Sequence, residues 1–593
     1  MPWELFLIIN AAAADRQERS AAVMKVSGKI LLCILIWSGF SASCCEAAVY
    51  HSDGSPANVQ FIHNTQAVDG DTITLPAGTF SWTTYVTITK AVTIQGQTTT
   101  DSSSGTFDDN TIILDNVNRA SGEGGTIIKI ESVNGKSYRV SGITFSSGAV
   151  SDDSGSGAIK LMGDSHAVRF DHCHFGGMVH QAIYIAVWGA IQGVIDHNVM
   201  AFEHGQSQSF YIGMGNWGGR TNGHGSWADP PYYGSEKFIF IEDNYLINTS
   251  GHEFAGNTDG SRGGRSVFRH NRCYDIEMQG HGTEAEYYRG ERCKEIYNNE
   301  FHFTNKVSAG GVRSGGLITH DNTWYGALLY GGMEIQAYRT FFRGVSSPWG
   351  GASGDNPWDY NVTEPDGSHV DGHPPFLYES GTVSSATQTT LTDNTKNWTT
   401  NQWAGYTLKR LSDKGLSLIS SNTNNTLVVV YYTDRGGIIW GPGDQYQIHR
   451  VLISMDQPCR GKGDLVSGDD LHPVNSTTGT QSWTHDALEP CYSWKDVHSP
   501  DDTPVNIRVR AGQFPLGLFV QGRDYFNQTL MPGYRPYTYP HPLTTSLPPP
   551  QPTQSATPSP QNQSHNKQAK KVKRWKWGRA KESSANERAA PDY

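Results

Sequence analysis

The sequence predicts an all-β chain in which a solenoid of short parallel strands occupies the first half, and three observations carry that prediction. The chain has 65 glycines and only 17% charged residues, which suits short strands joined by tight turns better than helices. Residues 68–96 alternate apolar and polar side chains between glycine and proline, as short strands do. A short phrase centred mostly on asparagine then recurs at a nearly constant step. A repeat of that length indicates a solenoid.

The recurring phrase places its central residue at positions 173, 198, 244, 271, 299 and 322, in steps of 25, 46, 27, 28 and 23. The phrases that contain asparagine at this position are centred on Asn198, Asn244, Asn271, Asn299 and Asn322. Stacked side-chain amides at a bend can hydrogen-bond along the axis of a solenoid, with coils about 4.8 Å apart. The alternative is that asparagine only favours turns. The step of 46 is either one coil with an excursion or two coils of which one is degraded.

The opening Gly-Asp-Thr-Ile-Thr-Leu-Pro-Ala-Gly-Thr-Phe at residues 70–80, followed by the asparagine-marked coils, resembles the pectin-lyase-like superfamily. The resemblance covers residues 49–345 and implies a right-handed, single-stranded parallel β-helix. That superfamily contains polysaccharide lyases, polygalacturonase-type hydrolases, phage tailspikes and noncatalytic adhesins. One fold hosts many activities, and no catalytic family motif matches this chain residue by residue. The resemblance therefore implies a fold and no particular reaction.

The composition along the chain divides it into six segments. The apolar run at 30–40 follows two lysines and precedes small residues, the order of a secretory signal peptide. The threonine- and serine-rich stretch near 380–449 reads as a small inserted β domain, and the proline-rich and then basic end reads as a disordered tail. Residues 1–23 are expected to be an over-called start, with Met24 as the true start. The other segments are the signal peptide (24–48), the parallel β-helix (49–375), the inserted β domain (376–450), a return to the β-helix with a C-terminal cap (451–543) and the tail (544–593).

The charge balance excludes some partners. The formal net charge is −11 and the body of the chain has no basic surplus, so a nucleic-acid partner is not expected. An acidic polysaccharide would need a local cationic site on such a chain. The basic tail, with Trp575 and Trp577 among its lysines, would suit an anionic surface such as a membrane or a wall polymer, although a solvated tail explains it as well. The export signal predicts a secreted or cell-surface protein, with a lipoprotein form as an alternative.

Acids and arginines repeat at the spacing of the coils before two of the ladder asparagines. Counted back from the next asparagine, two copies of an acid-x-x-Arg-x-x-Arg pattern lie one residue out of register, and a third arginine follows on the next coil. These residues are Asp259, Arg262 and Arg265, then Glu286, Arg289 and Arg292, then Arg313. Residues at equal offsets in a solenoid become neighbours, so we expect the acids to stack about 5 Å apart.

This spacing permits three kinds of chemistry. Asp259 and Glu286, with Glu284 beside them, could bind Ca²⁺ through hard oxygen ligands. Asp259 and Glu286 could instead act as the paired acids of glycoside hydrolysis. Arginines could neutralise a sugar carboxylate and so favour β-elimination, with His281 or His252 as the proton acceptor. The structural alternative is a surface ladder of ion pairs, each worth about 0–1 kcal/mol.

The glycine- and tryptophan-rich excursion at 213–234 lies next to these coils in the sequence. Trp217 and Trp227, with His224 between them, have the composition of a wall that stacks on sugar rings. Packing against the solenoid explains the same residues equally well. Arg265 and Arg292 would complete a substrate-binding surface.

These observations favour an exported polysaccharide-active protein, either a lyase or a glycoside hydrolase acting on a linear, uronate-containing polymer. The alternative is a noncatalytic carbohydrate-binding or adhesive surface protein, which the inserted domain and the basic tail would also suit.

Overall fold

The computed structural model describes residues 47–119, 126–149, 157–219, 223–282, 289–306, 308–328, 331–336, 377–404, 407–413, 416–429, 438–449, 457–461, 487–510 and 519–546. The predicted upstream start, all but the last two residues of the predicted signal peptide, and the tail beyond residue 546 lie outside this set. Glu284 and Glu286 also lie outside it, and of His224 only the backbone is described.

Three long sheets, which we call A, B and C, contain most of the strands. Sheet A runs β1 (Val49–His51), β2 (Thr72–Thr74), β5 (Thr93–Gln95), β10 (Ser137–Ser141), β13 (Ala167–Asp171), β16 (Gly193–Asp196), β19 (Ile239–Glu242), β22 (Arg265–Arg269), β25 (Cys293–Tyr297), β28 (Ser314–His320), β41 (Cys491–Trp494) and β45 (Tyr525–Phe526), with β38 (Gln457–Pro458) also paired to β28. Sheet B runs β3 (Gly78–Trp82), β8 (Thr111–Asp115), β11 (Thr144–Ser147), β14 (His174–Phe175), β17 (Val199–Phe202), β20 (Tyr245–Asn248), β23 (Arg272–Tyr274), β26 (Glu300–Lys306), β29 (Thr323–Leu328), β42 (Val497–Ser499) and β43 (Thr503–Pro504). Sheet C runs β4 (Val86–Ile88), β9 (Ile128–Ser132), β12 (Ile159–Gly163), β15 (Ile183–Val187), β18 (Gln208–Gly213), β21 (Asn257–Ser261), β24 (Met278–Gly280), β27 (Gly310–Val312), β30 (Glu334–Gln336) and β44 (Arg508–Arg510).

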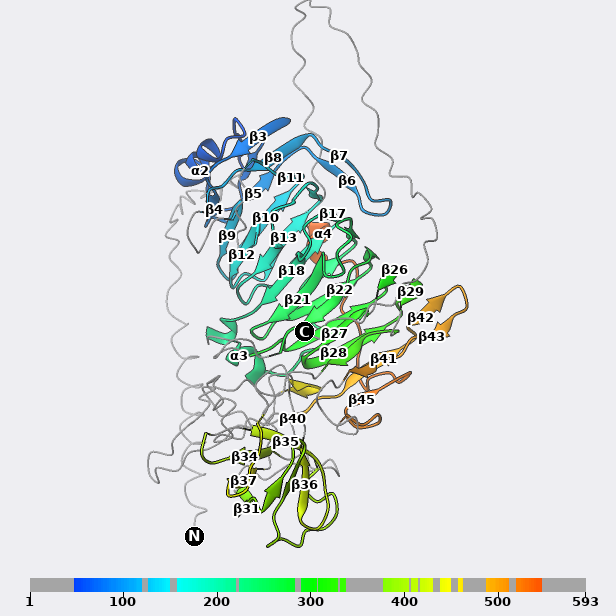
Figure 1. Ribbon diagram of the computed structural model, residues 1–593. Coiled ribbons are helices and arrows are strands. Elements are labelled where there is room, and N and C mark those ends of the chain that lie inside the picture. Colours follow the sequence, from blue (N-terminus) through cyan, green and yellow to red (C-terminus); the bar gives the residue numbers. More distant parts are fainter. Residues whose placement is uncertain are drawn as a thin grey trace, which may run out of the picture. The chain divides into compact units, whose positions relative to one another are not determined.

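The three sheets are parallel, and through the middle of the chain each turn of it adds one strand to each of them (Figure 1). The register is regular: Val140 pairs with Phe170, Phe170 with Ile195 and Ile195 with Ile241. Only the last pair of sheet B, β42 with β43, is antiparallel. The predicted all-β class is confirmed, and the arrangement of the sheets is compatible with a parallel β-helix.

Alternation of side chains along each strand builds the interior. In sheet A the inward row includes Ile94, Val140, Phe170 and Ile195, all at most 1% exposed. Helix α2 (Pro56–Thr65) packs at the N-terminal end, where the Ser55 hydroxyl accepts a hydrogen bond from the Asn58 N–H and caps the helix. Burial of apolar rows from all three sheets therefore forms one continuous core.

The ladder asparagines meet at one bend, between sheets A and B. The Oδ1 of each accepts a hydrogen bond from the backbone N–H of the ladder residue one coil before it, at 2.9–3.0 Å, from Asn198 through Asn244, Asn271 and Asn299 to Asn322. The Asn198 N–H donates directly to Asn244, so the step of 46 residues is one coil with an excursion. At the end of the ladder Asp496 takes the place of a further asparagine and accepts the Asn322 N–H at 2.9 Å.

A separate antiparallel sheet is formed by residues 377–449. Its strands are ordered β31 (Leu377–Thr382), β37 (Gln445–His449), β34 (Thr407–Arg410), β35 (Leu416–Asn422), β36 (Thr426–Val429), β33 (Thr390–Thr392) and β32 (Ser385–Ala386). Trp398, Trp403 and Trp440 are 7%, 6% and 3% exposed and pack in its core. These tryptophans therefore stabilise the sheet and do not offer ring faces to a sugar.

The short elements outside these sheets are the hairpin of β6 (Thr99–Asp101) and β7 (Thr106–Asp108), the pair β39 (Arg460–Gly461) and β40 (Ala487–Leu488), the 3-10 turn η1 (Trp217–Gly219), α3 (His224–Ala228) and α4 (Pro542–Ser546). Within the described ranges, no helix has the length and apolar character needed to cross a membrane.

Candidate functional site

The outward face of sheet C carries two parallel rows of polar and aromatic side chains. In the first row Lys160 pairs with Ala186, Ala186 with Tyr211 and Tyr211 with Asp259. Three coils farther along the same row, Glu334 is in register with Arg508. In the second row Gly213 pairs with Ser261, and His281 follows the last residue of the adjacent strand β24. Because neighbouring strands of sheet C are parallel and in register, these side chains form a strip that runs across the strands, in the direction in which they stack.

Asp259 and His281 form the chemical centre of this strip. The Asp259 carboxylate is 2% exposed and bonds the Nδ1 of His281, whose side chain is 29% exposed. Asp259 also accepts hydrogen bonds from the Gln208 Nε2 at 2.7 Å and from the Gly260 N–H at 2.8 Å. A buried carboxylate that holds Nδ1 fixes the orientation of the imidazole and leaves Nε2 as the nitrogen that accepts a proton.

An aromatic and cationic surface adjoins the pair. The Trp188 and Tyr211 rings lie 4.8 Å apart, centroid to centroid. The Arg262 guanidinium lies 5.2 Å from the Trp188 ring and the Lys160 ammonium 5.3 Å from it. The Tyr211 hydroxyl makes a short hydrogen bond with Ser261, and burial raises the pKa of the tyrosine. Half-buried aromatic rings flanked by cations suit a sugar ring that carries a carboxylate.

The structure brings the two predicted arginine pairs together across one coil. The Arg262 N–H donates to the Arg289 carbonyl at 2.7 Å, and Arg265 on β22 pairs in register with Cys293, the neighbour of Arg292. Arg262 alone of these four is not fully buried. Glu286, on which Asp259 is expected to stack, lies outside the described residues. The residue paired with Asp259 on the preceding coil is Tyr211.

Arg265 and Arg292 hold the protein together, which corrects the expectation that they face a substrate. The Arg265 guanidinium donates to the Ser226, Pro230 and Pro231 carbonyls at 2.6–2.8 Å and so fixes the excursion to sheet A. Arg292 makes two hydrogen bonds to Glu489, at 2.6 and 2.8 Å. Both side chains are fully buried, because the excursion and the returning chain cover them.

The excursion packs against the parallel sheets, which agrees with one of its two predicted roles. Trp217 and Trp227 are 6% and 1% exposed. Their Nε1 atoms donate to Asp229 at 2.9 Å and to the Gly290 carbonyl at 3.0 Å. Their faces are occupied by Arg265, Arg289 and Arg292, whose guanidinium carbons lie 4.7–5.5 Å from the rings. The expected sugar-stacking role of these tryptophans is therefore replaced by packing.

The remaining predicted residues fall in different places. Arg313 is 7% exposed and donates from Nε to the Gly280 carbonyl at 3.3 Å, directly behind His281. His252 lies in the turn before β21, at the opposite end of that strand from His281, and its Nδ1 accepts the Phe254 N–H at 3.2 Å. Of the two histidines, His281 is the one that the structure places beside Asp259.

Asp259 is the residue of the predicted Ca²⁺ site that the structure describes. Its two carboxylate oxygens accept hydrogen bonds, from Gly260 and His281 on one side and from Gln208 on the other. Glu284 and Glu286, the other proposed ligands, lie outside the described residues.

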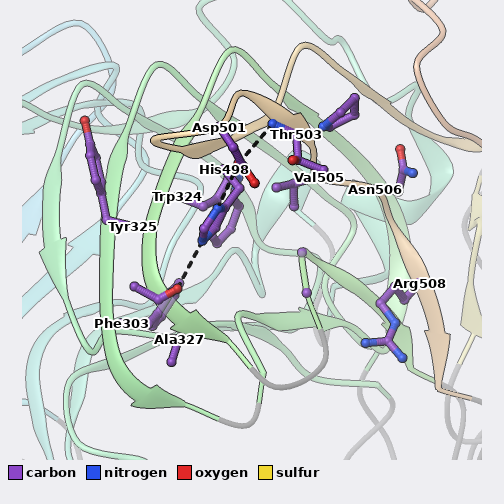
Figure 2. Close-up of a pocket in the computed structure, with 14 residues that line it drawn as sticks. Phe303, Trp324, Tyr325, Ala327, His498, Asp501, Thr503, Val505, Asn506 and Arg508 are labelled. Atoms are coloured by element: carbon purple, nitrogen blue, oxygen red, sulfur yellow. Dashed lines mark hydrogen bonds and ion pairs between the residues drawn. The ribbon is translucent and has the colours of Figure 1, made fainter.

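Two cavities lie elsewhere among the described residues. One, of about 770 Å³, lies between β29 and the β42–β43 hairpin, and Figure 2 shows His498 beside Trp324 within it. Both ring nitrogens of His498 are engaged, with the Gly326 carbonyl at 3.1 Å and Asp501 at 3.2 Å. The second, of about 600 Å³, lies between the β6–β7 hairpin and the asparagine bend. Neither contains a residue that the sequence singles out for chemistry.

Sequence reasoning missed Trp188, Tyr211, Lys160 and Gln208. The signal was available in part, since Tyr211 and Asp259 occupy the same outward row once the 46-residue coil is aligned. Comparisons with protein-family models, with curated proteins and with solved structures found no match to this chain.

Proposed function

We propose that this chain is an exported right-handed parallel β-helix protein of the pectin-lyase-like kind that cleaves a linear, uronate-containing polysaccharide. The observation that carries the proposal is the Asp259–His281 pair beside Trp188 and Arg262 on one outward strip. The strip runs along the axis of the coils, where repeated groups can follow a linear polymer.

β-Elimination is the reaction that this arrangement supports best. Arg262 and Lys160 would neutralise the uronate carboxylate and so make the adjacent C–H more acidic. The Nε2 of His281 would take that proton as Asp259 stabilises the imidazolium. The electron pair would form a carbon–carbon double bond as the glycosidic C–O bond breaks, and the departing oxygen would take a proton from solvent. Hydrolysis by the paired acids Asp259 and Glu286 is the other reaction that the sequence predicts, and Glu286 lies outside the described residues.

A noncatalytic carbohydrate-binding role is the second candidate. It is favoured by the Trp188–Tyr211 platform with its flanking cations, because stacking and charge alone would hold an acidic polymer without turnover.

The test is incubation of the purified protein with a panel of uronate and neutral polysaccharides. Ultraviolet absorbance of an unsaturated product indicates elimination, new reducing ends without that absorbance indicate hydrolysis, and binding without either product indicates the second candidate. His281→Ala should lower the rate of elimination by about 10²–10⁴-fold. His302→Ala is the matched control, because its side chain is 30% exposed and lies on sheet B. Equal rates for both variants would contradict His281 as the base.

A further inference from the structure

The inward row of sheet C is interrupted directly beneath the site. Leu161, Val187 and Ile212 fill it on one side, and Val312 and Ile335 fill it on the other. Between them the same row carries Gly260 and Gly280, on β21 and β24. These two strands also carry Asp259 and precede His281, so the apolar core is absent where the chemical groups lie on the outside.

The carboxylate of Glu291 occupies the space that the two glycines leave. A Cβ atom added at Gly260 would lie 2.2 Å from its Oε1, and one added at Gly280 would lie 2.1 Å from its Oε2. Side chains do not approach this closely, so any larger residue at either position would displace the carboxylate. The glycines are needed here for space.

Glu291 is paired inside the core with a cation. The Lys294 ammonium lies 3.3 Å from Oε1 and donates to the Gln279 carbonyl. Glu291 is fully buried and Lys294 is 2% exposed. Within the described part of the chain neither carboxylate oxygen accepts a hydrogen bond. Taking a charge pair out of water costs several kcal/mol per ion before the attraction is counted, so such a pair in a core is a candidate for a functional role.

The backbone connects Glu291 to the proposed base. The His281 N–H donates to the Gly260 carbonyl at 2.7 Å, and the Glu291 N–H donates to the His281 carbonyl at 3.0 Å. His281 is therefore held between the strand that carries Asp259 and the residue that places a carboxylate beneath that strand.

We propose that Glu291 is a positioning residue that, from inside the solenoid, sets the proton affinity of the Asp259–His281 pair. The proposal deepens the proposed function and rests on it for its meaning, although the electrostatic coupling can be measured without turnover.

The charges around Glu291 define the direction of the effect. Burial raises the pKa of the Glu291 carboxyl to about 7, Asp259 raises it further and Lys294 opposes the rise. Other charged groups on or next to the packed elements include Glu277 before β24, His281 after β24 and Arg313 after β27, whose Nε donates to the Gly280 carbonyl. Arg262 follows β21, and Arg289 lies two residues before Glu291. When Glu291 ionises near neutral pH, its negative charge favours the protonated form of His281. Removing that charge should therefore lower the pKa of His281.

The experiment measures the pKa of His281 directly, from the pH dependence of its acylation by diethyl pyrocarbonate, read by mass spectrometry of the full-length protein. The variants are Glu291→Gln, the double variant Glu291→Gln with Lys294→Met, which removes both charges together, and Glu291→Asp, which keeps the charge. Glu300→Gln on the outward face of sheet B is the control.

We expect Glu291→Gln to lower the pKa of His281 by about one unit, and Glu291→Asp and the control to leave it unchanged. The acid limb of the pH–rate profile should move by the same amount. An unchanged His281 pKa in folded Glu291→Gln overturns the proposal. The double variant removes no net charge, so it should move the pKa of His281 less than Glu291→Gln does. If Glu291→Gln does not fold, Gly280→Ala decides, because its methyl group displaces the Glu291 carboxylate, and an unchanged pKa of His281 there overturns the proposal equally. If neither variant folds, the carboxylate serves the fold alone, which also overturns the proposal. A shifted pKa in a protein without turnover supports the coupling and refutes the proposed reaction instead.

Discussion

The outward faces of sheets A and C both carry pairs of oppositely charged or titratable side chains, but the two faces differ in how far these side chains are exposed. On sheet A, Arg169 pairs with Asp196 at 2.7 Å and Arg269 with Glu242 at 2.6 Å, and all four side chains are at most 1% exposed. The segment that precedes and includes α4 lies over them and accepts the outer guanidinium hydrogens, at the Tyr537 carbonyl for Arg269.

On sheet C the carboxylate of Asp259 is buried, but its partner, the imidazole of His281, is partly exposed. Asp259 is as enclosed as Asp196, whereas the imidazole of His281 keeps 29% of its surface exposed. A covered ion pair can only support the fold, but a covered acid that orients an accessible base can act on a ligand. Whether another segment of the chain covers a charged side chain therefore determines whether it supports the fold or can contact a ligand. Substitutions on the two faces should have different effects.

The largest expected effect is on the covered face. Arg269→Ala leaves the Glu242 carboxylate buried without its cation, so we expect the free energy of unfolding to fall by about 3–5 kcal/mol. Chemical denaturation measures it. Arg272→Ala is the control, because its pair with Glu300 is about 40% exposed on both sides, and it should cost about 0–1 kcal/mol. Equal losses would remove the distinction between covered and exposed pairs.

The next effect concerns Asp496 at the end of the ladder and depends on pH. Burial raises the pKa of Asp496 from 3.8 to about 7, so the folded protein keeps a proton that the unfolded chain releases. Stability from this group is therefore present below about pH 4 and is lost as the pH rises to about 7. Asp496→Asn continues the ladder without a charge and should stabilise the fold by about 4 kcal/mol at pH 8 and little at pH 4.

Unfolding curves at the two pH values measure this difference. Asp501→Asn, at a carboxylate that is 61% exposed, should show no such gain at pH 8. A gain of equal size at both pH values would show that titration of Asp496 is not its cause.

A smaller loss is expected inside the ladder. Asn271→Ala removes the Oδ1 that accepts two hydrogen bonds from Asn244, at 3.0 Å each, and leaves those buried donors unpaired. We expect a loss of about 2 kcal/mol in the free energy of unfolding. Asn298→Gly, at an exposed position with a φ of 56°, keeps the turn and should change stability by less than about 1 kcal/mol. Similar values for both would mean that the ladder contributes no more than its turns.

The smallest effect is expected on the open face. Trp188→Ala removes the ring beside Arg262 and should weaken binding of the uronate polymer by about 1 kcal/mol, or roughly fivefold. Calorimetric titration of the folded variant measures it. Tyr325→Ala, on the outward face of sheet B, is the aromatic control and should bind as the unmodified protein does. An unchanged affinity for Trp188→Ala would place the polymer elsewhere.

The sequence repeat alone predicted the all-β class and the asparagine bend. Residues that recur at a nearly constant spacing in the chain become neighbours in space when the coils stack. Asn244 and Asn271 are neighbours on successive coils for that reason, and so are Arg262 and Arg289. The identity of His281 as a candidate base also came from the sequence, from its place among recurring acids and arginines.

Only the tertiary structure decided which of these charges remain accessible. Arg265, Arg289 and Arg292 belong to the same sequence pattern as Arg262, but the excursion and the returning chain bury these three. A local sequence pattern does not predict this burial, because the segments that bury these arginines lie far from them in the sequence. The sequence did not predict the position of Glu291 beneath Gly260 and Gly280 for the same reason. That position depends on space inside the core, which forms only when the coils stack.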